Sequence, residues 1–405
     1  MIEPKLRFKA DDGSQFPDWE EHNFGDLYKV CSGYAFKYEN YCDSGVALIN
    51  GQSIQHGWID DNNMNYLPEA FLQQYEDFAL KENDIVLGLN RPITNGKLKI
   101  ARVPKEYNNS LLYQRAGKIV CKKAVDDDFS YALLAREIFK FTIKEAAGSD
   151  QPFISTSKLN KWKIIVPSSE QEQQKIAEFL STIDTVIEKQ KETVSAWEER
   201  KKGVMQKLFS QEVRFKADDG SDFPDWEEKK LSEMFKKVIE KNRLDLPPLT
   251  IVQGYGTIRR DESERRIAYD EKGLKNYKVV QKDDFIVHLR SFEGGLEIAN
   301  QDGIVSPAYH VYRGNDEVHP SFYYPYFRSS SFIKGKLAIC VTGVRDGKNI
   351  EMGSFDELLI PHPCLAEQKK IADCLSSLDE VIEKQKATLA AWEELKKGLL
   401  QQMFV

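Results

Sequence analysis

The chain has 405 residues, of which 41% are hydrophobic and 11% aromatic, a composition typical of a soluble globular protein with about two or three domains. No run approaches eighteen apolar residues and the amino terminus has no apolar leader, so we expect no membrane span, no secretory signal and a cytoplasmic location. The net charge of −7 disfavours a uniformly basic nucleic-acid binder, so the distribution of charge along the chain becomes the informative quantity.

The first feature in chain order is a lead-in that occurs twice. "RFKADDGSQFPDWEE" runs from Arg7 to Glu21 and "RFKADDGSDFPDWEE" from Arg214 to Glu228, and the two differ only at Gln15 and Asp222. The offset of 207 residues is about half of the chain, which indicates an internal duplication. The roughly 140 residues after each lead-in nevertheless share almost no sequence similarity, and we call them the first and second variable segments.

The first variable segment alternates short β-type runs with helical stretches, which predicts an α+β domain. Its runs include "DIVLGLN" and "KWKIIVP", while "YALLAREIFKFTIKEAA" is helical in character. From Lys81 to Lys123 there are ten Lys or Arg residues against three acidic residues, a local charge of +7. The polar tips of such a fold are where recognition groups usually lie.

The tip "GLNRPITNGKLK" carries residue types suited to DNA. Arg and Asn can form bidentate pairs with guanine and adenine edges, while Lys and Thr suit phosphates. Aromatic residues stand between the charges, namely Tyr34, Phe36, Tyr38 and Trp58. The candidate DNA contacts of this segment are Tyr34, Lys37, Asn90, Arg91, Thr94, Asn95, Lys97 and Lys99.

Two similar stretches, within residues 167–212 and 362–405, predict two long helices. "EQQKIAEFLSTIDTVIEKQKETVSAWEERKKGVMQKLF" and "EQKKIADCLSSLDEVIEKQKATLAAWEELKKGLLQQMF" match at 24 of 38 positions, with seam residues spaced alternately four and three apart. This narrow seam is typical of a coiled coil, and an antiparallel pair would put the two variable domains at opposite ends. Gln190 and Gln385 occupy equivalent seam positions, where they either fix the register or are solvated. Two separate helices, each lying on its own domain, are the alternative.

The second variable segment is also read as α+β, with "FIVHLR" and "KLAICVTG" among its expected strands. From Arg328 to Lys348 there are five basic residues against one acidic residue, a local charge of +4. Phe292, Tyr309 and Tyr312 are its aromatic residues near the charges. The candidate DNA contacts are Arg259, Arg260, Arg290, Ser291, Arg345 and Lys348.

The sequence predicts no catalytic site and no metal site. "GVRDGK" is one residue too short for a phosphate loop, and Asn349 stands where Ser or Thr should bind magnesium. The six cysteines form no C-x-x-C pair and the six histidines show no ligand spacing. We therefore expect a protein that is not an enzyme and holds no cofactor of its own.

The order of these parts resembles the specificity subunit of type I restriction-modification systems. The helix entrance P-x(3–5)-E-Q-x-x-I-A occurs twice, in "IIVPSSEQEQQKIAEFL" and "LLIPHPCLAEQKKIADCL", and "GYAFKYENY", "STSKLNKWKIIVP" and "LRSFEGGLEIANQDGIVSPAY" are similar to pieces of that family's target-recognition domains. The resemblance covers the whole chain. It implies an α+β fold with two globular target-recognition domains separated by two long conserved antiparallel helices, a coiled coil with pseudo-twofold symmetry.

The resemblance also implies boundaries, a function and partners. Residues 1–166 would hold the first lead-in and target-recognition domain 1, 167–212 the central helix, 213–361 target-recognition domain 2, and 362–405 the distal helix. Each domain would read one half of an asymmetric, interrupted site in double-stranded DNA. Two methyltransferase (modification) subunits using S-adenosylmethionine, and motor-endonuclease (restriction) subunits using ATP and Mg, would assemble on the chain.

Two further hypotheses stay open from the sequence. One is a coiled-coil adaptor that binds only protein, which the local charges of +7 and +4 disfavour. The other is an enzyme with an unrecognised site, such as a fused restriction-modification protein, which the missing motifs disfavour.

Overall fold

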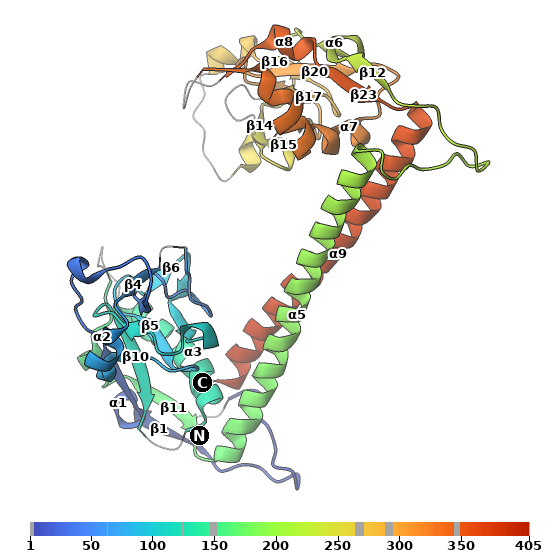
Figure 1. The fold of residues 1–405 in the computed structure, drawn as a ribbon. Helices are drawn as coiled ribbons and strands as arrows, with labels where there is room; N and C mark the ends of the chain where they lie inside the picture. Colours follow the sequence, from blue (N-terminus) through green and yellow to red (C-terminus); the bar gives the residue numbers. More distant parts are fainter. Residues whose placement is uncertain are drawn as a thin grey trace. The chain divides into compact units, whose positions relative to one another are not determined.

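The computed structural model describes residues 4–62, 64–122, 125–145, 152–263, 271–287, 295–343 and 349–404. The chain forms two compact units (Figure 1). Unit 1 comprises Met1–Lys189 and Leu389–Val405, and unit 2 comprises Gln190–Thr388. Each of the two long helices, α5 (Glu170–Phe209) and α9 (Leu365–Met403), therefore contributes one part to each unit.

Unit 1 is an α+β domain built on antiparallel strands. Its helices besides α5 and α9 are α1 (Phe24–Leu27), α2 (Ala70–Gln74), α3 (Asp127–Glu145) and α4 (Thr156–Leu159). Its strands are β1 (Trp19–Asn23), β2 (Tyr28–Ser32), β3 (Val46–Ile49), β4 (Asn65–Leu67), β5 (Ile85–Gly88), β6 (Ile93–Thr94), β7 (Lys97–Leu98), β8 (Ile100–Arg102), β9 (Leu111–Leu112), β10 (Ala116–Cys121) and β11 (Lys163–Pro167).

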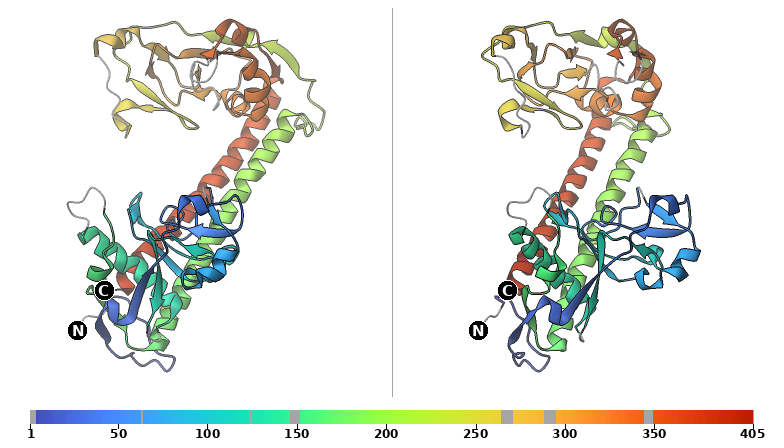
Figure 2. Two further views of the ribbon diagram at one scale, coloured as in Figure 1. Left: turned by 60° about the vertical axis from the view of Figure 1, so that its left-hand side comes forward. Right: turned by 90° about the vertical axis from the view of Figure 1, so that its left-hand side faces the viewer.

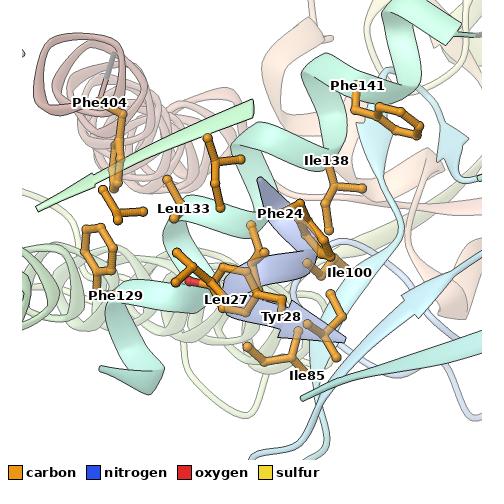
Figure 3. Packing of buried hydrophobic residues seen from close by; sticks show 14 of the residues in the cluster. Phe24, Leu27, Tyr28, Ile85, Ile100, Phe129, Leu133, Ile138, Phe141 and Phe404 are labelled. Atoms are coloured by element: carbon orange, nitrogen blue, oxygen red, sulfur yellow. The ribbon is translucent and has the colours of Figure 1, made fainter. Parts of the chain in front are cut away.

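The central sheet of unit 1 has the strand order β2-β10-β5-β8, and α3 packs on it. Figure 3 shows one buried cluster that includes Phe129, Leu133 and Ile138 of α3 as well as Ile85 of β5. Because side chains alternate along a strand, Val86 points away from this cluster into a second one, so β5 is buried on both faces. The run "DIVLGLN" was predicted as a strand from its β-type residues, and the prediction is confirmed.

Unit 2 repeats the plan of unit 1 with different residues. Its helices besides α5 and α9 are α6 (Leu231–Met234), α7 (Pro320–Phe327) and α8 (Met352–Asp356). Its strands are β12 (Glu227–Lys230), β13 (Phe235–Lys237), β14 (Leu249–Val252), β15 (Gly256–Arg259), β16 (Lys278–Val280), β17 (Phe285–Val287), β18 (Glu297–Ile298), β19 (Gly303–Val305), β20 (His310–Gly314), β21 (Val341–Thr342), β22 (Asn349–Ile350) and β23 (Leu359–His362).

Two sheets of each unit correspond in strand order. The order β13-β20-β17-β18 in unit 2 matches β2-β10-β5-β8 in unit 1, and the pair β12-β23 matches β1-β11. β17 is again buried on both faces, with Phe285 in one cluster and Ile286 in another. The variable segments thus share two sheets of the same strand order although their sequences show almost no similarity.

An acidic corner before the central strand is also common to both units. In unit 1 the backbone N–H of Lys81 donates to Asp84, whose carboxylate pairs with Lys118 at 2.6 Å. In unit 2 the N–H of Gln281 donates to Asp284, which receives two hydrogen bonds from Arg313 at 2.7 and 2.8 Å. In each case the cation comes from the neighbouring strand, β10 or β20, so the corner fixes the sheet register.

One expected strand is wrong. Within "KLAICVTG", Leu337–Cys340 is a 3-10 helix, and only Val341 and Thr342 belong to a strand. The burial pattern gives the reason: Leu337 and Cys340 are buried, whereas Ile339 is 77% exposed. Buried positions three residues apart suit a helical turn rather than the two-residue period of a strand.

The long helices pair antiparallel in unit 2. Gln190 Nε2 donates to Gln385 Oε1 at 2.8 Å, and Lys201 Nζ pairs with Asp379 at 2.5 Å. The residue number of the contact on α9 thus falls as the residue number on α5 rises, which is the pattern of an antiparallel pair. The two seam glutamines fix register through their mutual hydrogen bond, as one of the two readings of the sequence expected.

The helices also pair antiparallel in unit 1. Lys396 of α9 pairs with Asp184 of α5, while Ile176 and Met403 lie in one core cluster. Lys396 and Asp184 are the repeat equivalents of Lys201 and Asp379, so the same ion pair occurs in each unit with the roles of the helices exchanged. Figure 2 shows the helices side by side within each unit, which excludes two separate helices.

Each lead-in is fastened to a helix start by a buried carboxylate. Glu172, fully buried on the first turn of α5, receives hydrogen bonds from Arg7 Nε at 2.7 Å and from Trp19 Nε1 at 3.2 Å. The equivalent Glu367 of α9 receives them from Arg214 and Trp226. A buried carboxylate needs such partners, since its desolvation otherwise costs several kcal/mol. The repeated sequences of the lead-in and of the helix entrance therefore form the same junction in both units.

Candidate nucleic-acid interface

The tip of unit 1 is a two-strand hairpin, β6 and β7, that projects from the end of β5 through Leu89 to Pro92. Asn95 and Gly96 form its turn with φ values of +51° and +73°. Positive φ at both central residues is what a type I′ turn requires, and Asn-Gly is its preferred sequence. Thr94 and Lys97 lie opposite each other and are exposed, whereas Leu98 is buried in the core. The hairpin therefore presents polar side chains outward from an apolar root.

The chain before the hairpin is held by backbone pairing. Arg91 has a φ of +45°, uncommon for a residue with a side chain, and its N–H donates to Pro152 O at 3.0 Å. The N–H of Ile154 donates to Leu89 O at 2.9 Å. Asn90, between the two bonds, is exposed like Arg91. The structure therefore brings Asn90, Arg91, Thr94, Asn95 and Lys97 together on one braced projection.

Lys99 differs from the other candidates of this tip. It is half-buried, and its Nζ donates to Gly51 O at 3.0 Å. Burial, followed by the charge of Arg91, lowers the pKa of Lys99. Its ammonium thus ties the hairpin root to a neighbouring loop, which makes it a weaker candidate for a phosphate contact than Lys97.

Much of the positive charge of unit 1 is neutralised locally. Arg102 pairs with Asp128 at 2.7 Å and Lys118 with Asp84. For Arg91 and Lys97 no ion pair is found among residues that the structure describes. These two cations of the tip are therefore the ones best placed to meet an anionic backbone.

Tyr34 and Lys37 lie on a separate segment that follows β2. Tyr34 is 40% exposed and packs on Tyr75 with ring centroids 4.6 Å apart, while Lys37 pairs with Glu39 at 3.4 Å. Of the early aromatic residues, Tyr38 and Trp58 are exposed, but Phe36 is buried in a core cluster.

The candidates of unit 2 divide into paired cations and positions that are not described. Arg259, at the end of β15, makes two hydrogen bonds to Asp261, which raise the pKa of Arg259. Arg260 Nη1 donates to the Tyr277 hydroxyl at 3.2 Å, with its guanidinium over that ring. Arg290, Ser291, Arg345 and Lys348 lie outside the described residues, as does Phe292. Tyr312 is buried, and its hydroxyl donates to Asp356.

Sequence reasoning missed the groups that position these tips. Glu172, Glu367, Asp84 and Asp284 read as ordinary surface acids, yet each has a cationic or indole partner distant in sequence. The identity of the repeats at Arg7, Trp19 and Glu172 was the available signal for the junction. No cluster of three or more potential metal ligands, and no helix apolar enough to cross a bilayer, is found in the described portion of the chain.

Comparison with known proteins gives a consistent result. The family described as "Type I restriction modification DNA specificity domain" matches residues 17–195 and 224–391. The type I restriction enzyme MjaVIII specificity subunit of Methanocaldococcus jannaschii is 36% identical over 218 residues, 53% of this chain and 51% of that protein. The EcoAI specificity subunit of Escherichia coli is 31% identical over 42% of this chain and 28% of its own length. This chain thus spans about half the length of the MjaVIII subunit and less of the EcoAI subunit.

Full-length similarity is also found. The putative MjaX specificity subunit of Methanocaldococcus jannaschii is 26% identical over 97% of this chain and 94% of that protein. The S subunit from M. genitalium has the same fold, with a TM-score of 0.53, 17% identity and coverage of 100% of this chain and 99% of the other. A chain from a structure of type I R-M complex assembly and conformational transition gives 0.55, 16% identity and coverage of 96% and 98%. With the family matched across both units, this chain belongs to the type I restriction-modification DNA specificity subunits, as its sequence had indicated.

Proposed function

We propose that the chain is the non-catalytic subunit that gives a type I restriction-modification complex its DNA sequence specificity. Each unit would read one half of an asymmetric, interrupted site in duplex DNA. The observation that carries the proposal is the pairing of a common framework with variable sequence: the sheet order, acidic corner and Arg-Glu-Trp junction recur in both units, but the segments that they carry, such as the hairpin β6-β7 of unit 1, share almost no sequence.

The tip of unit 1 has the residue types that base reading needs. Arg91 and Asn95 can form bidentate pairs with guanine and adenine, and Lys97 can contact a phosphate. The hairpin is braced at its root by Lys99 and by the backbone pairing of Arg91, so little flexibility is lost on binding. Its two-strand form fits the major groove, which admits a β-ribbon.

The partners follow from the same proposal. Two methyltransferase subunits would bind the repeated junctions and helices, and motor-endonuclease subunits would join that complex. S-adenosylmethionine, ATP and Mg would be held by those subunits rather than by this chain. The antiparallel helices would then set the distance between the two half-sites.

Selection from a random duplex library tests the proposal. The full chain, alone and with modification subunits, is incubated with the library, and the bound DNA is sequenced. We expect a two-part sequence with a fixed gap of unspecified bases. A binder of protein alone would enrich no sequence, and a single uninterrupted motif would contradict the division of labour between units.

A further inference from the structure

The connection between β14 and β15 in unit 2 presents one aromatic residue to solvent. Tyr255 stands between Gly254 and Gly256 and is 64% exposed. Its N–H donates to Val252 O at 3.0 Å, and Gly254 has a φ of +83°. Positive φ at the third position of a four-residue turn favours glycine, as in a type II turn.

A buried carboxylate braces this turn from below. Glu297 on β18 is 4% exposed, and its Oε1 accepts from the N–H of Gly254 at 2.9 Å. The same carboxylate pairs with Arg328 and accepts from the Tyr324 hydroxyl at 3.1 Å. Burial, and then the charge of Glu297, raises the pKa of Tyr324, so its hydroxyl stays protonated and donates. The turn is thus fixed to the central sheet through β18.

A second brace acts on the other side of Tyr255. Asn300 Nδ2 donates to Tyr255 O at 2.8 Å, and the N–H of Asn300 donates to Thr257 Oγ1 at 3.0 Å. Gly256 has a φ of +100°, and a Cβ there would lie 2.6 Å from Ile298 O. The backbone on both sides of the exposed ring is therefore held in one conformation.

The backbone on both sides of Tyr255 is held by hydrogen bonds although its ring lies outside the core, so packing of the ring does not explain these hydrogen bonds. An aromatic side chain on a fixed backbone has only two torsions to lose, so it makes a large contact at low entropic cost. The hairpin leads into residues 259–262, where two arginines are balanced by Asp261 and Glu262, so the exposed ring rather than a net charge is what this turn offers to a partner. Duplex DNA, the partner under the function proposed above, offers such a ring apolar surface at its base edges and sugars.

We propose that Tyr255 is a specificity-determining contact of unit 2, whose ring packs on the DNA half-site, and that Glu297 is the positioning residue that holds its turn. This proposal rests on the function proposed above. It assigns a contact to unit 2 that does not depend on Arg259, whose guanidinium already has an acidic partner.

Library selection on the full chain with modification subunits tests this assignment, using Tyr255→Ala and Tyr255→Phe. We expect Tyr255→Ala to relax the base preference in one half-site and to weaken binding to the selected duplex about ten-fold, the size of one lost base contact. The other half-site is an internal control and stays unchanged. Tyr255→Phe keeps the ring and retains the preference.

Glu297→Gln tests the positioning role. We expect it to relax the same half-site, to speed hydrogen exchange at the Gly254 N–H, and to add little to Tyr255→Ala when the two changes are combined. A purely structural role would instead speed hydrogen exchange throughout the central sheet of unit 2, and the effects of the two changes on binding would add.

Ile239→Ala serves as the control, because Ile239 lies in the same unit and is 82% exposed. It should leave the selected sequence and the affinity unchanged. If Tyr255→Ala selects the wild-type sequence with wild-type affinity, the assignment of Tyr255 is wrong while the proposed function stands. If the wild-type chain itself selects no sequence, the proposed function has failed first.

Discussion

The two units of this protein share a framework and differ at their tips. Both hold a four-stranded sheet of corresponding order, an acidic corner before its central strand and a junction in which Arg and Trp bind a buried Glu. Unit 1 ends in a polar hairpin around Asn95, whereas unit 2 presents Tyr255 on a turn braced by Glu297. The shared sheet, acidic corner and junction therefore fix the position of each recognition segment. The sequence of that segment can change while the fold of the unit is kept.

The largest effect should come from changing the helices while both units stay intact. Inserting one heptad after Gln190 and another after Gln385 keeps each seam in phase and lengthens the pair by about 10 Å. At 3.4 Å per base pair, we expect selected half-sites about three base pairs further apart, with the same bases at each end.

Binding to the original spacing should weaken strongly, because the duplex would have to bend or twist at a cost of several kcal/mol. Three additional base pairs also rotate one half-site by roughly 100° about the duplex axis. The prediction therefore concerns the length of the selected gap and not a high affinity for it. Library selection reads the gap directly. An unchanged gap with full affinity would mean that the helices do not set the distance.

The junctions should be equally important in both units. Glu172→Ala removes the buried carboxylate that accepts hydrogen bonds from Arg7 and Trp19, and Glu367→Ala removes the one that accepts them from Arg214 and Trp226. We expect each change to lower the free energy of unfolding of its unit by about 3 to 5 kcal/mol, as for other broken buried pairs.

Denaturant unfolding followed by hydrogen exchange resolves the two units. Glu178→Ala and Asp373→Ala are matched controls, since both side chains lie at equivalent exposed positions of α5 and α9. A large loss in one unit and none in the other would show that the repeated junction is not equivalent.

The acidic corners should differ in strength. Asp284→Asn breaks a two-bond pair with Arg313 in which Asp284 is 2% exposed, and we expect a loss of about 2 to 3 kcal/mol in unit 2. Asp84→Asn breaks a single contact with Lys118 at a more exposed site, and we expect about 1 kcal/mol in unit 1. Denaturant midpoints compare the two directly, and equal losses would contradict the ranking.

The smallest effect concerns the salt dependence of DNA binding by unit 1. Lys97→Ala should reduce the slope of log affinity against log salt by about one, because one phosphate contact is lost, while the selected bases stay the same. Lys99→Ala should leave the slope unchanged, since its ammonium is bound to Gly51 O. Filter binding across salt concentrations measures both slopes. If Lys99→Ala reduces the slope as much as Lys97→Ala does, Lys99 also contacts the DNA.

The sequence alone determined the repeat, the two long helices and the α+β class. Each of these depends on local patterns: the four-three spacing of the seam and the apolar run of β5 can be recognised without any distant partner. The same holds for the polar tip of unit 1, whose exposed residues from Asn90 to Lys97 were predicted as candidate contacts.

Only the tertiary structure decided which side chains remain available and which brace the fold. Lys99, Phe36 and Tyr312 resemble surface candidates in sequence, but one is tied to Gly51 and the other two are buried. Asp284 finds Arg313 across 29 residues, and Glu172 finds Arg7 across 165. Such contacts depend on how strands and helices are brought together, which no local pattern encodes, and they are what holds each tip in place.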